Sequence, residues 1–181
     1  NRALREYFYD NEFTEVQTPK LLAAATEGGA EVFKLDYFGK EATLAQSPQF
    51  YKQMLVGVFE RVFEIAPAYR AEPSATTRHI TEYISVDAEM GFISMKDLEH
   101  LLSDLLHHVI DYIWEHCKTE LGMWNATKPI LAKEIPVLPM EEIHQLYSNA
   151  TGENCVGEKD MRPDEARWLC EYPANNLRSE A

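Results

Sequence analysis

Polar and ionisable side chains gather at alternate positions of two predicted strands, residues 61–72 and 82–93. Side chains alternate between the faces of a strand, so these groups share one face of a sheet. In sequence order they are Glu64, Arg70, Glu72, Tyr83, Asp87 and Glu89. The small residues Ala66, Ala68 and Gly91 lie among the charges, as if to leave room for a flat ligand. The pattern indicates a polar floor for a zwitterionic or phosphorylated ligand, and a solvated sheet face is the plainer alternative.

The loop that joins the two strands, residues 73–81, adds two basic side chains, Arg78 and His79. A strand, a basic loop and a returning strand can bring Arg70 and Arg78 to one polyphosphate. The planar guanidinium donates paired hydrogen bonds to phosphate oxygens, so arginine suits this task. By itself the loop indicates phosphate binding without choosing among the many proteins that bind nucleotides.

Other elements must hold these strands, and we predict their boundaries from periodicity and from the positions of proline and glycine. We expect a helix end at residues 2–12, an extended piece at 13–17, a loop at 21–30, a hairpin of 31–38 and 41–46 around Gly39 and Lys40, a helix from Ser47 and Pro48 to Val56, a long helix at 95–119, a strand at 133–138, and short helices at 140–148 and 163–172. Strands followed by helices predict an α+β fold with an antiparallel sheet flanked by helices.

The long helix at 95–119 carries an apolar stripe at helical spacing, which predicts a place in the core. Its members are Leu98, Leu101, Leu102, Leu105, Val109, Tyr112 and Ile113. The spacing of the histidines on this helix does not gather them on one face; they are His100, His107, His108 and His116. We therefore predict no metal site within this chain.

The chain has 181 residues, enough for one domain with a real core, and 45% of them are hydrophobic. Its net charge of −13 argues against a bare nucleic-acid-binding module, but not against an enzyme with a small basic cleft. The cysteines Cys117, Cys155 and Cys170 form no CxxC pair, which predicts a reducing, cytoplasmic setting without disulfides or a zinc knuckle. No apolar run approaches the ~18 residues of a membrane span, so we expect no membrane partner.

Three neighbouring segments carry a family resemblance. Residues 63–72 read FEIAPAYRAE, residues 76–83 read TTRHITEY, and residues 86–90 read VDAEM. Together they resemble motif 2 of the class II aminoacyl-tRNA synthetases, and the aspartyl/asparaginyl/lysyl subgroup is nearest. Within that subgroup the pattern is most similar to the archaeal and eukaryotic type of aspartyl enzyme.

Three earlier segments resemble the same family in the same order. Residues 13–21, FTEVQTPKL, are similar to the end of motif 1, which is the dimer element of the class. Residues 26–33, TEGGAEVF, are similar to the loop that closes over the amino acid, and residues 46–53, QSPQFYKQ, to the pattern of aspartate enzymes. The resemblance covers about residues 2–93, and residues 94–181 match loosely. It implies the class II catalytic fold and a homodimer formed through the motif 1 region.

The resemblance also implies roles for individual residues in ATP binding. Arg70 would bridge the α-carboxylate of aspartate and the α-phosphate of ATP, which makes it the catalytic residue. Glu72 would meet the amino edge of adenine or the 3′ end of the tRNA. Arg78 and His79 would hold the outer phosphates of ATP, and Tyr83 would stack on adenine.

An aspartate site follows from the same resemblance. Lys52 would bind the side-chain carboxylate of the substrate, and Asp87 would orient Lys52. The α-amino group would be held by Glu27, Gln46 and Gln49. The lysine favours aspartate, since the neutral amide of asparagine would leave a desolvated ammonium without a charge partner.

The implied reaction is a nucleotidyl transfer. A carboxylate oxygen of aspartate attacks the α-phosphorus of ATP to give aspartyl-adenylate and pyrophosphate, and the aspartyl group then passes to a ribose hydroxyl of tRNA. No protein nucleophile is needed, because positioning and charge neutralisation by arginine and Mg²⁺ carry most of the rate.

Two elements of the family have no counterpart in this sequence. The third motif is a glycine-rich strand and helix that ends in an ATP-binding arginine, but no glycine follows Gly157. An anticodon-binding domain is not found either. We therefore expect residues 1–181 to form part of a catalytic domain, with the motifs in 1–93 and a helical region in 94–181. We expect this chain to be inactive in aminoacylation when alone.

Three alternatives stay open. A paralogue of the same fold, related to asparagine synthetase, would activate aspartate and amidate the free amino acid. An asparaginyl-tRNA synthetase would bind its amino acid without Lys52. A non-enzymatic fragment that dimerises through motif 1 would keep its function after Arg70→Ala.

Overall fold

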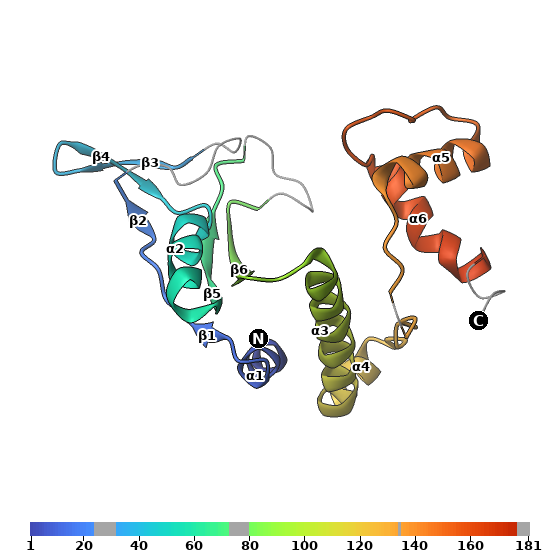
Figure 1. The fold of residues 1–181 in the computed structure, drawn as a ribbon, viewed down its shortest axis with the longest axis horizontal. Helices are drawn as coiled ribbons and strands as arrows, with labels where there is room; N and C mark the ends of the chain where they lie inside the picture. Colours follow the sequence, from blue (N-terminus) through green and yellow to red (C-terminus); the bar gives the residue numbers. More distant parts are fainter. Residues whose placement is uncertain (24–31, 73–79, 134, 177–181) are drawn as a thin grey trace. The chain divides into compact units, whose positions relative to one another are not determined.

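The structure is a computed structural model that describes residues 1–23, 32–72, 80–133 and 135–176, with the backbone alone for 173–176. The chain divides into two compact units, residues 1–130 and 131–181. Figure 1 identifies the elements of each unit along the chain. The first unit holds two small sheets and helices α1 to α4, and the second holds the helices α5 and α6.

The main sheet has the strand order β1 (Thr14–Glu15), β5 (Arg61–Tyr69) and β6 (Glu82–Met90). Strands β5 and β6 are antiparallel and pair along their whole length, with Glu64 opposite Asp87. The predicted antiparallel pair and the α+β class are therefore confirmed. The two-residue strand β1 runs parallel to β5, so the sheet is mixed, which the sequence did not indicate.

A second sheet has the strand order β2 (Leu21–Leu22), β4 (Lys40–Leu44) and β3 (Lys34–Tyr37). Strands β3 and β4 form the predicted hairpin, but its turn lies one residue earlier than predicted, at Phe38 and Gly39. These two residues have φ of 51° and 76°, as the two-residue turn of type I′ requires. The sequence predicts a loop from residue 21, but residues 21 and 22 form the strand β2, which pairs with β4.

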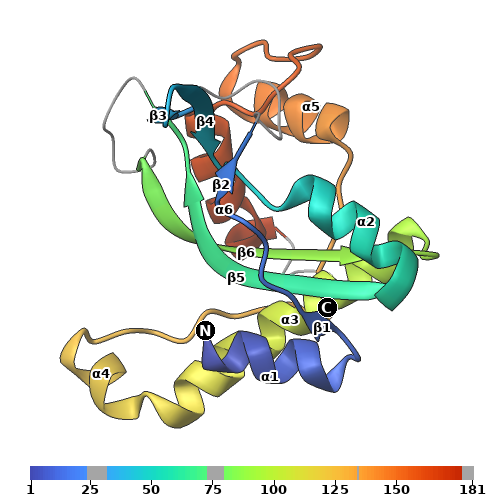
Figure 2. The same cartoon turned by 90° about the vertical axis from the view of Figure 1, so that its left-hand side faces the viewer.

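Helices α1 (Arg2–Asp10) and α3 (Met95–His116) cover the apolar face of β5 and β6, as Figure 2 shows. The buried core of this layer consists of Tyr7, Phe8, Phe13, Phe63 and Ile65, against which Leu101 and Leu105 pack. The Phe63 ring stacks on Phe8 with 4.7 Å between centroids. Burial of a side chain of this size contributes about 2–3 kcal/mol. The predicted stripe of α3 is only partly buried, because Leu98 and Leu102 are exposed.

The ends of α3 have clear local causes. Ser94 and Asp97 form a reciprocal capping box at its start, which satisfies backbone N–H groups that the helix itself leaves without partners. The long helix predicted to reach residue 119 ends at His116. A separate helix, α4 (Lys118–Met123), follows the cap residue Cys117.

Helix α2 (Gln49–Phe59) lies on the opposite side of the main sheet from α1 and α3 (Figure 2). Its N-cap is Pro48, one residue later than predicted, and Ser47 Oγ accepts a hydrogen bond from Gln49 N at 3.2 Å. A Cβ on Gly91 would lie 2.6 Å from Val56 Cγ1. The small size of Gly91 therefore admits the helix, and the prediction that it leaves room for a ligand is wrong.

The second unit is built from α5 (Met140–Thr151) and α6 (Pro163–Asn176). The strand predicted at residues 133–138 is wrong, because residues 133 and 135–138 form no strand. Pro136 lies within this segment and supplies no N–H for a ladder of hydrogen bonds, which explains the difference. Among the described residues, no helix is long and apolar enough to cross a membrane.

Candidate functional site

The polar face of β5 and β6 is assembled by their register. Cross-strand partners on this face are Val62 with Glu89, Glu64 with Asp87, Ala66 with Ser85, and Ala68 with Tyr83. Side chains of directly opposed residues have Cβ atoms about 5 Å apart. The two strands therefore bring carboxylates together at one end of the face and small and aromatic side chains at the other.

Lys52 reaches this face from the first turns of α2. Its side chain is buried, and its Nζ lies 3.3 Å from Asp87 Oδ1 and 3.6 Å from Glu89 Oε2. Asp87 Oδ2 also accepts a hydrogen bond from Ser85 Oγ at 2.5 Å. The two carboxylates offset the cost of burying the ammonium. The structure thus brings Lys52 and Asp87 together, as the sequence predicted.

Glu64 lies beside this group and is almost fully buried. Its carboxylate accepts hydrogen bonds from Thr18 N at 2.7 Å and from Thr18 Oγ1 at 2.8 Å. Lys20 Nζ forms an ion pair with it at 2.9 Å. Sequence reasoning placed Glu64 on the polar face but missed Thr18 and Lys20. A charged residue within an otherwise apolar buried strand was the available signal, because such a residue needs a partner.

Arg70 and Tyr83 meet at the far end of the strands. The guanidinium carbon of Arg70 lies 5.9 Å from the centroid of the Tyr83 ring, a cation–π contact. Arg70 Nε is buried and has no hydrogen-bond partner among the described residues. Glu72, two residues later, is half-buried. The Tyr83 ring holds the guanidinium in place, and the guanidinium Nε has no partner among the described residues. Such a group is suited to bind an anionic ligand.

Gln46 and Gln49 lie on the segment that leads from β4 into α2. Gln46 is buried, and Gln49 is the first residue of the helix and half-buried. Tyr69 N donates to Ala45 O at 3.0 Å, which ties this segment to the end of β5 just before Arg70. The segment from Ala45 to Lys52 therefore begins beside the arginine end of the polar face and ends at the lysine.

Three predicted site residues, Glu27, Arg78 and His79, lie outside the described residues. The described part of the site contains a buried lysine held by carboxylates and an arginine over a tyrosine ring. Such a face can bind a ligand that carries both carboxylate and phosphate groups.

Comparison with known proteins extends these observations. The family model for class II tRNA synthetases (D, K and N) matches residues 1–179. The chain is 43% identical to an aspartate–tRNA(Asp/Asn) ligase of Deinococcus radiodurans over 98% of its own length and 41% of that protein. It is 50% identical to the ligase of the same name from Saccharolobus solfataricus, over 93% of its length and 39% of that protein. The chain thus spans about two fifths of the length of these curated relatives.

A solved structure agrees with the sequence comparison. The asparaginyl-tRNA synthetase of Pyrococcus horikoshii, complexed with asparaginyl-adenylate, superposes with a TM-score of 0.83 at 32% identity. The match covers 94% of this chain and 40% of that one. The overall arrangement of elements is therefore one that solved members of this group of enzymes share.

Proposed function

The chain belongs to the class II tRNA synthetases of the D, K and N group, and on that premise we propose that it is part of an aspartate–tRNA ligase. In this proposal the protein activates aspartate with ATP and transfers the aspartyl group to tRNA. The observation that carries the choice of amino acid is the buried Lys52, held by Asp87 and Glu89 on the polar face. The names of the relatives from Deinococcus and Saccharolobus support the same choice.

The choice of aspartate rests on charge. An aspartate side chain brings a carboxylate, which Lys52 can bind while Asp87 and Glu89 hold the ammonium in place. An asparagine amide brings no charge, so a buried ammonium would gain less from it than from a carboxylate. The site therefore favours aspartate by charge attraction.

Arg70 would hold the reacting groups at the other end of the face. Its guanidinium can donate to the α-carboxylate of aspartate and to the α-phosphate of ATP together, which aligns the attacking oxygen with phosphorus. The carboxylate oxygen forms the new bond to phosphorus, and the bond to pyrophosphate breaks with its electron pair. The buried Nε of Arg70, free of partners among the described residues, supports this role.

The remaining residues would bind the rest of the substrates. Tyr83 would stack on adenine, and Glu72 would meet the adenine amino edge or the tRNA 3′ end. Outside the described residues, Arg78 and His79 would hold the outer phosphates of ATP, which enters as its Mg²⁺ complex.

The α-amino group of aspartate would be held by Gln46, Gln49 and Glu27. Their position in the sequence supports this assignment, since Gln46 and Gln49 precede Lys52 on one connection. We further propose a homodimer formed through the motif 1 region, residues 13–21, and a cytoplasmic location. Sedimentation velocity tests the dimer, and a monomer at micromolar concentration would contradict it.

Calorimetric titration of the full-length protein with aspartate and with asparagine, each with ATP present, tests the proposed function. We expect heat of binding from aspartate and little or none from asparagine. A preference for asparagine would identify an asparaginyl enzyme. Binding of aspartate followed by amidation of the free amino acid, without transfer to tRNA, would identify the asparagine synthetase-like paralogue. Unchanged function in Arg70→Ala would contradict an enzymatic role altogether.

A further inference from the structure

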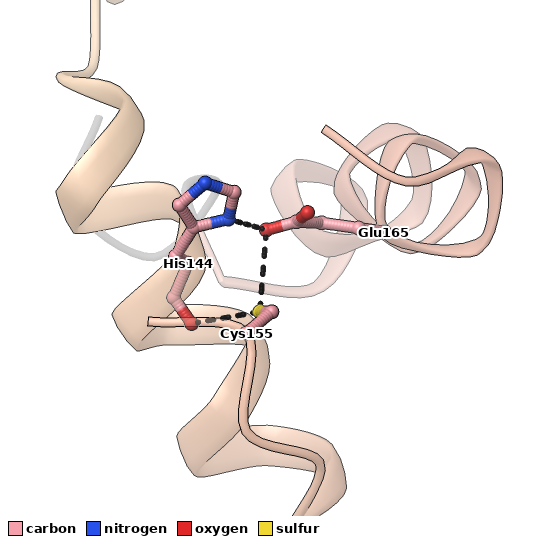
Figure 3. Close-up of side chains that lie close together, drawn as sticks. All are labelled: His144, Cys155 and Glu165. Carbon is pink, nitrogen blue, oxygen red and sulfur yellow. Dashed lines mark hydrogen bonds and ion pairs between the residues drawn. The ribbon is translucent and has the colours of Figure 1, made fainter. Parts of the chain in front are cut away.

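A buried cluster of three side chains in the second unit has no role in the proposed reaction. His144 comes from the first turns of α5, Glu165 from the first turn of α6, and Cys155 from the loop between the two helices. Figure 3 shows the three side chains converging from these segments. Each residue is exposed by 1% or less. Imidazole, thiolate and carboxylate are the three side-chain types that bind Zn²⁺ in proteins.

The donor atoms of the cluster lie close together. His144 Nδ1 is 2.7 Å from Glu165 Oε1, and Cys155 Sγ is 3.7 Å from the same oxygen. One donor atom from each of the three residues lies within 4.8 Å of the other two. Tetrahedral Zn²⁺ with ordinary bond lengths separates nitrogen from oxygen by about 3.3 Å and sulfur from oxygen by about 3.5 Å. Side-chain shifts of about half an ångström would therefore admit the ion.

The charge of the cluster gives a physical reason for an ion. Arg162 pairs its guanidinium with Glu153 and Asp164, and only its backbone N–H, at 3.3 Å, reaches Glu165. No lysine or arginine side chain in the described part of the chain forms an ion pair with Glu165. The described chain therefore supplies no lysine or arginine counter-charge to this buried carboxylate, and a buried carboxylate without one is costly.

The second ring nitrogen of His144 must be accounted for in a zinc-bound cluster. His144 Nε2 is buried and has no hydrogen-bond partner among the described residues. The zinc-bound ring would carry a proton at this nitrogen, and the bonds from the ion to its three ligands would have to offset the burial of that N–H.

We propose that His144, Cys155 and Glu165 form a structural Zn²⁺ site that ties α5 to α6. Cys155 Sγ binds as thiolate and releases its proton to solvent. Nδ1 binds through its lone pair after the ring proton moves to Nε2, and Glu165 binds through Oε1. Three protein ligands leave a fourth position for water. The net charge of the cluster changes from −1 to zero on binding, because Zn²⁺ enters as one proton leaves.

Cobalt serves as the spectroscopic probe, because Co²⁺ takes the same ligands and absorbs light. The 181-residue chain, reduced and stripped of metal, is titrated with CoCl₂. We expect one equivalent to bind with visible d–d bands and a thiolate-to-cobalt charge-transfer band in the near ultraviolet. Added ZnCl₂ should displace the cobalt and abolish both. Absence of the charge-transfer band from the folded wild-type chain would overturn the proposal.

A double variant assigns the band to Cys155 without changing any residue of the buried cluster. The double variant Cys117→Ser and Cys170→Ser keeps Cys155 as the only thiol, and Cys170 is exposed while Cys117 is half-buried. We expect this variant to retain the band and Cys155→Ser to lose it. Loss of the band in the double variant would refute the site, whether or not Cys155→Ser folds.

Thermal unfolding gives a readout that does not depend on colour. Because a ligand that binds only the folded state stabilises it, Zn²⁺ should raise the unfolding temperature of the wild-type chain. A chelator should reverse that shift, and Glu165→Gln should show a much smaller one. An equal Zn²⁺ shift in wild type and Glu165→Gln would show that the ion binds elsewhere, and the cluster would then be a metal-free hydrogen-bonded clamp.

Discussion

Replacement of Lys52 with methionine tests the aspartate site, because methionine keeps much of the length of the side chain and removes the charge. The Lys52 side chain is 6% exposed, and its ammonium lies 3.3 Å from Asp87 and 3.6 Å from Glu89. The variant therefore leaves two carboxylates facing a thioether. It also removes the cation that would bind the substrate carboxylate.

The burial of these groups sets the expected size of two effects, the loss of stability and the loss of aspartate affinity. Removal of one partner from a buried ion pair costs about 3–5 kcal/mol, and partial exposure moves the value toward the lower end. Asp87 and Glu89 are 19% and 29% exposed, so water solvates part of the stranded charge. A hydrogen bond between charged groups in such a site is worth about 3 kcal/mol to the substrate. At 1.4 kcal/mol for each factor of ten, aspartate should bind about a hundredfold more weakly.

Calorimetry with aspartate at a fixed ATP concentration measures this change, and circular dichroism verifies that the variant folds. The matched control is Lys128→Met, which removes an exposed lysine whose ion pair with Asp111 is open to solvent. Because exposed pairs contribute about 0–1 kcal/mol, its aspartate affinity should stay close to that of the wild type.

A double variant separates the cost to stability from the loss of binding. Asp87→Asn in the Lys52→Met background removes one stranded carboxylate, so we expect stability to recover in part while aspartate binding stays weak. A folded Lys52→Met variant that binds aspartate within about threefold of the wild type would refute the reasoning, since that is well under 1 kcal/mol. Lys52 would then be a structural cation, and the substrate carboxylate would be bound elsewhere.

Three further predictions concern stability. Phe63→Ala should lower the free energy of unfolding by about 3–5 kcal/mol in urea titration, because it opens a cavity in the aromatic core, and a loss below about 1 kcal/mol would contradict that core. Glu64→Gln should lower it by about 2 kcal/mol, since Lys20 loses its partner, and Lys20→Met should give a similar loss if the pair acts as a unit. Hydrogen bonds from Ser94 hold the pKa of Asp97 below its usual 3.8. The stability that this carboxylate contributes is therefore present above about pH 4 and is lost as the pH falls through the lowered pKa. Asp97→Asn should make the unfolding temperature less dependent on pH in that acidic range. An unchanged dependence on pH would argue against the capping box.

The alternation of side chains predicted the two main strands and their polar face, although the strands predicted at 61–72 and 82–93 each end three residues earlier, at Tyr69 and Met90. A period of two depends on backbone geometry alone, so the order of residues is enough to assign Glu64, Asp87 and Tyr83 to one face. The apolar spacing of α3 predicted a packed helix for a similar local reason. Prediction failed at residues 133–138, where Pro136 supplies no N–H to a strand ladder. It also extended α3 to residue 119, although the helix ends at His116, and it assigned to the core stripe Leu98 and Leu102, which are exposed.

Pairings between distant segments required the tertiary structure. The ion pair of Lys20 with Glu64 joins residues 44 positions apart, and no local pattern specifies which buried carboxylate a lysine will meet. The same holds for the convergence of His144, Cys155 and Glu165, whose spacing matches no familiar metal motif.

By itself, then, the sequence determined the family, the fold class and which residue types carry the chemistry, because these depend on short-range pattern and motif. Only the tertiary structure decided which charges are buried and what compensates them. The free energy of a buried charge depends on all the atoms around it, and those atoms come from segments that are far apart along the chain.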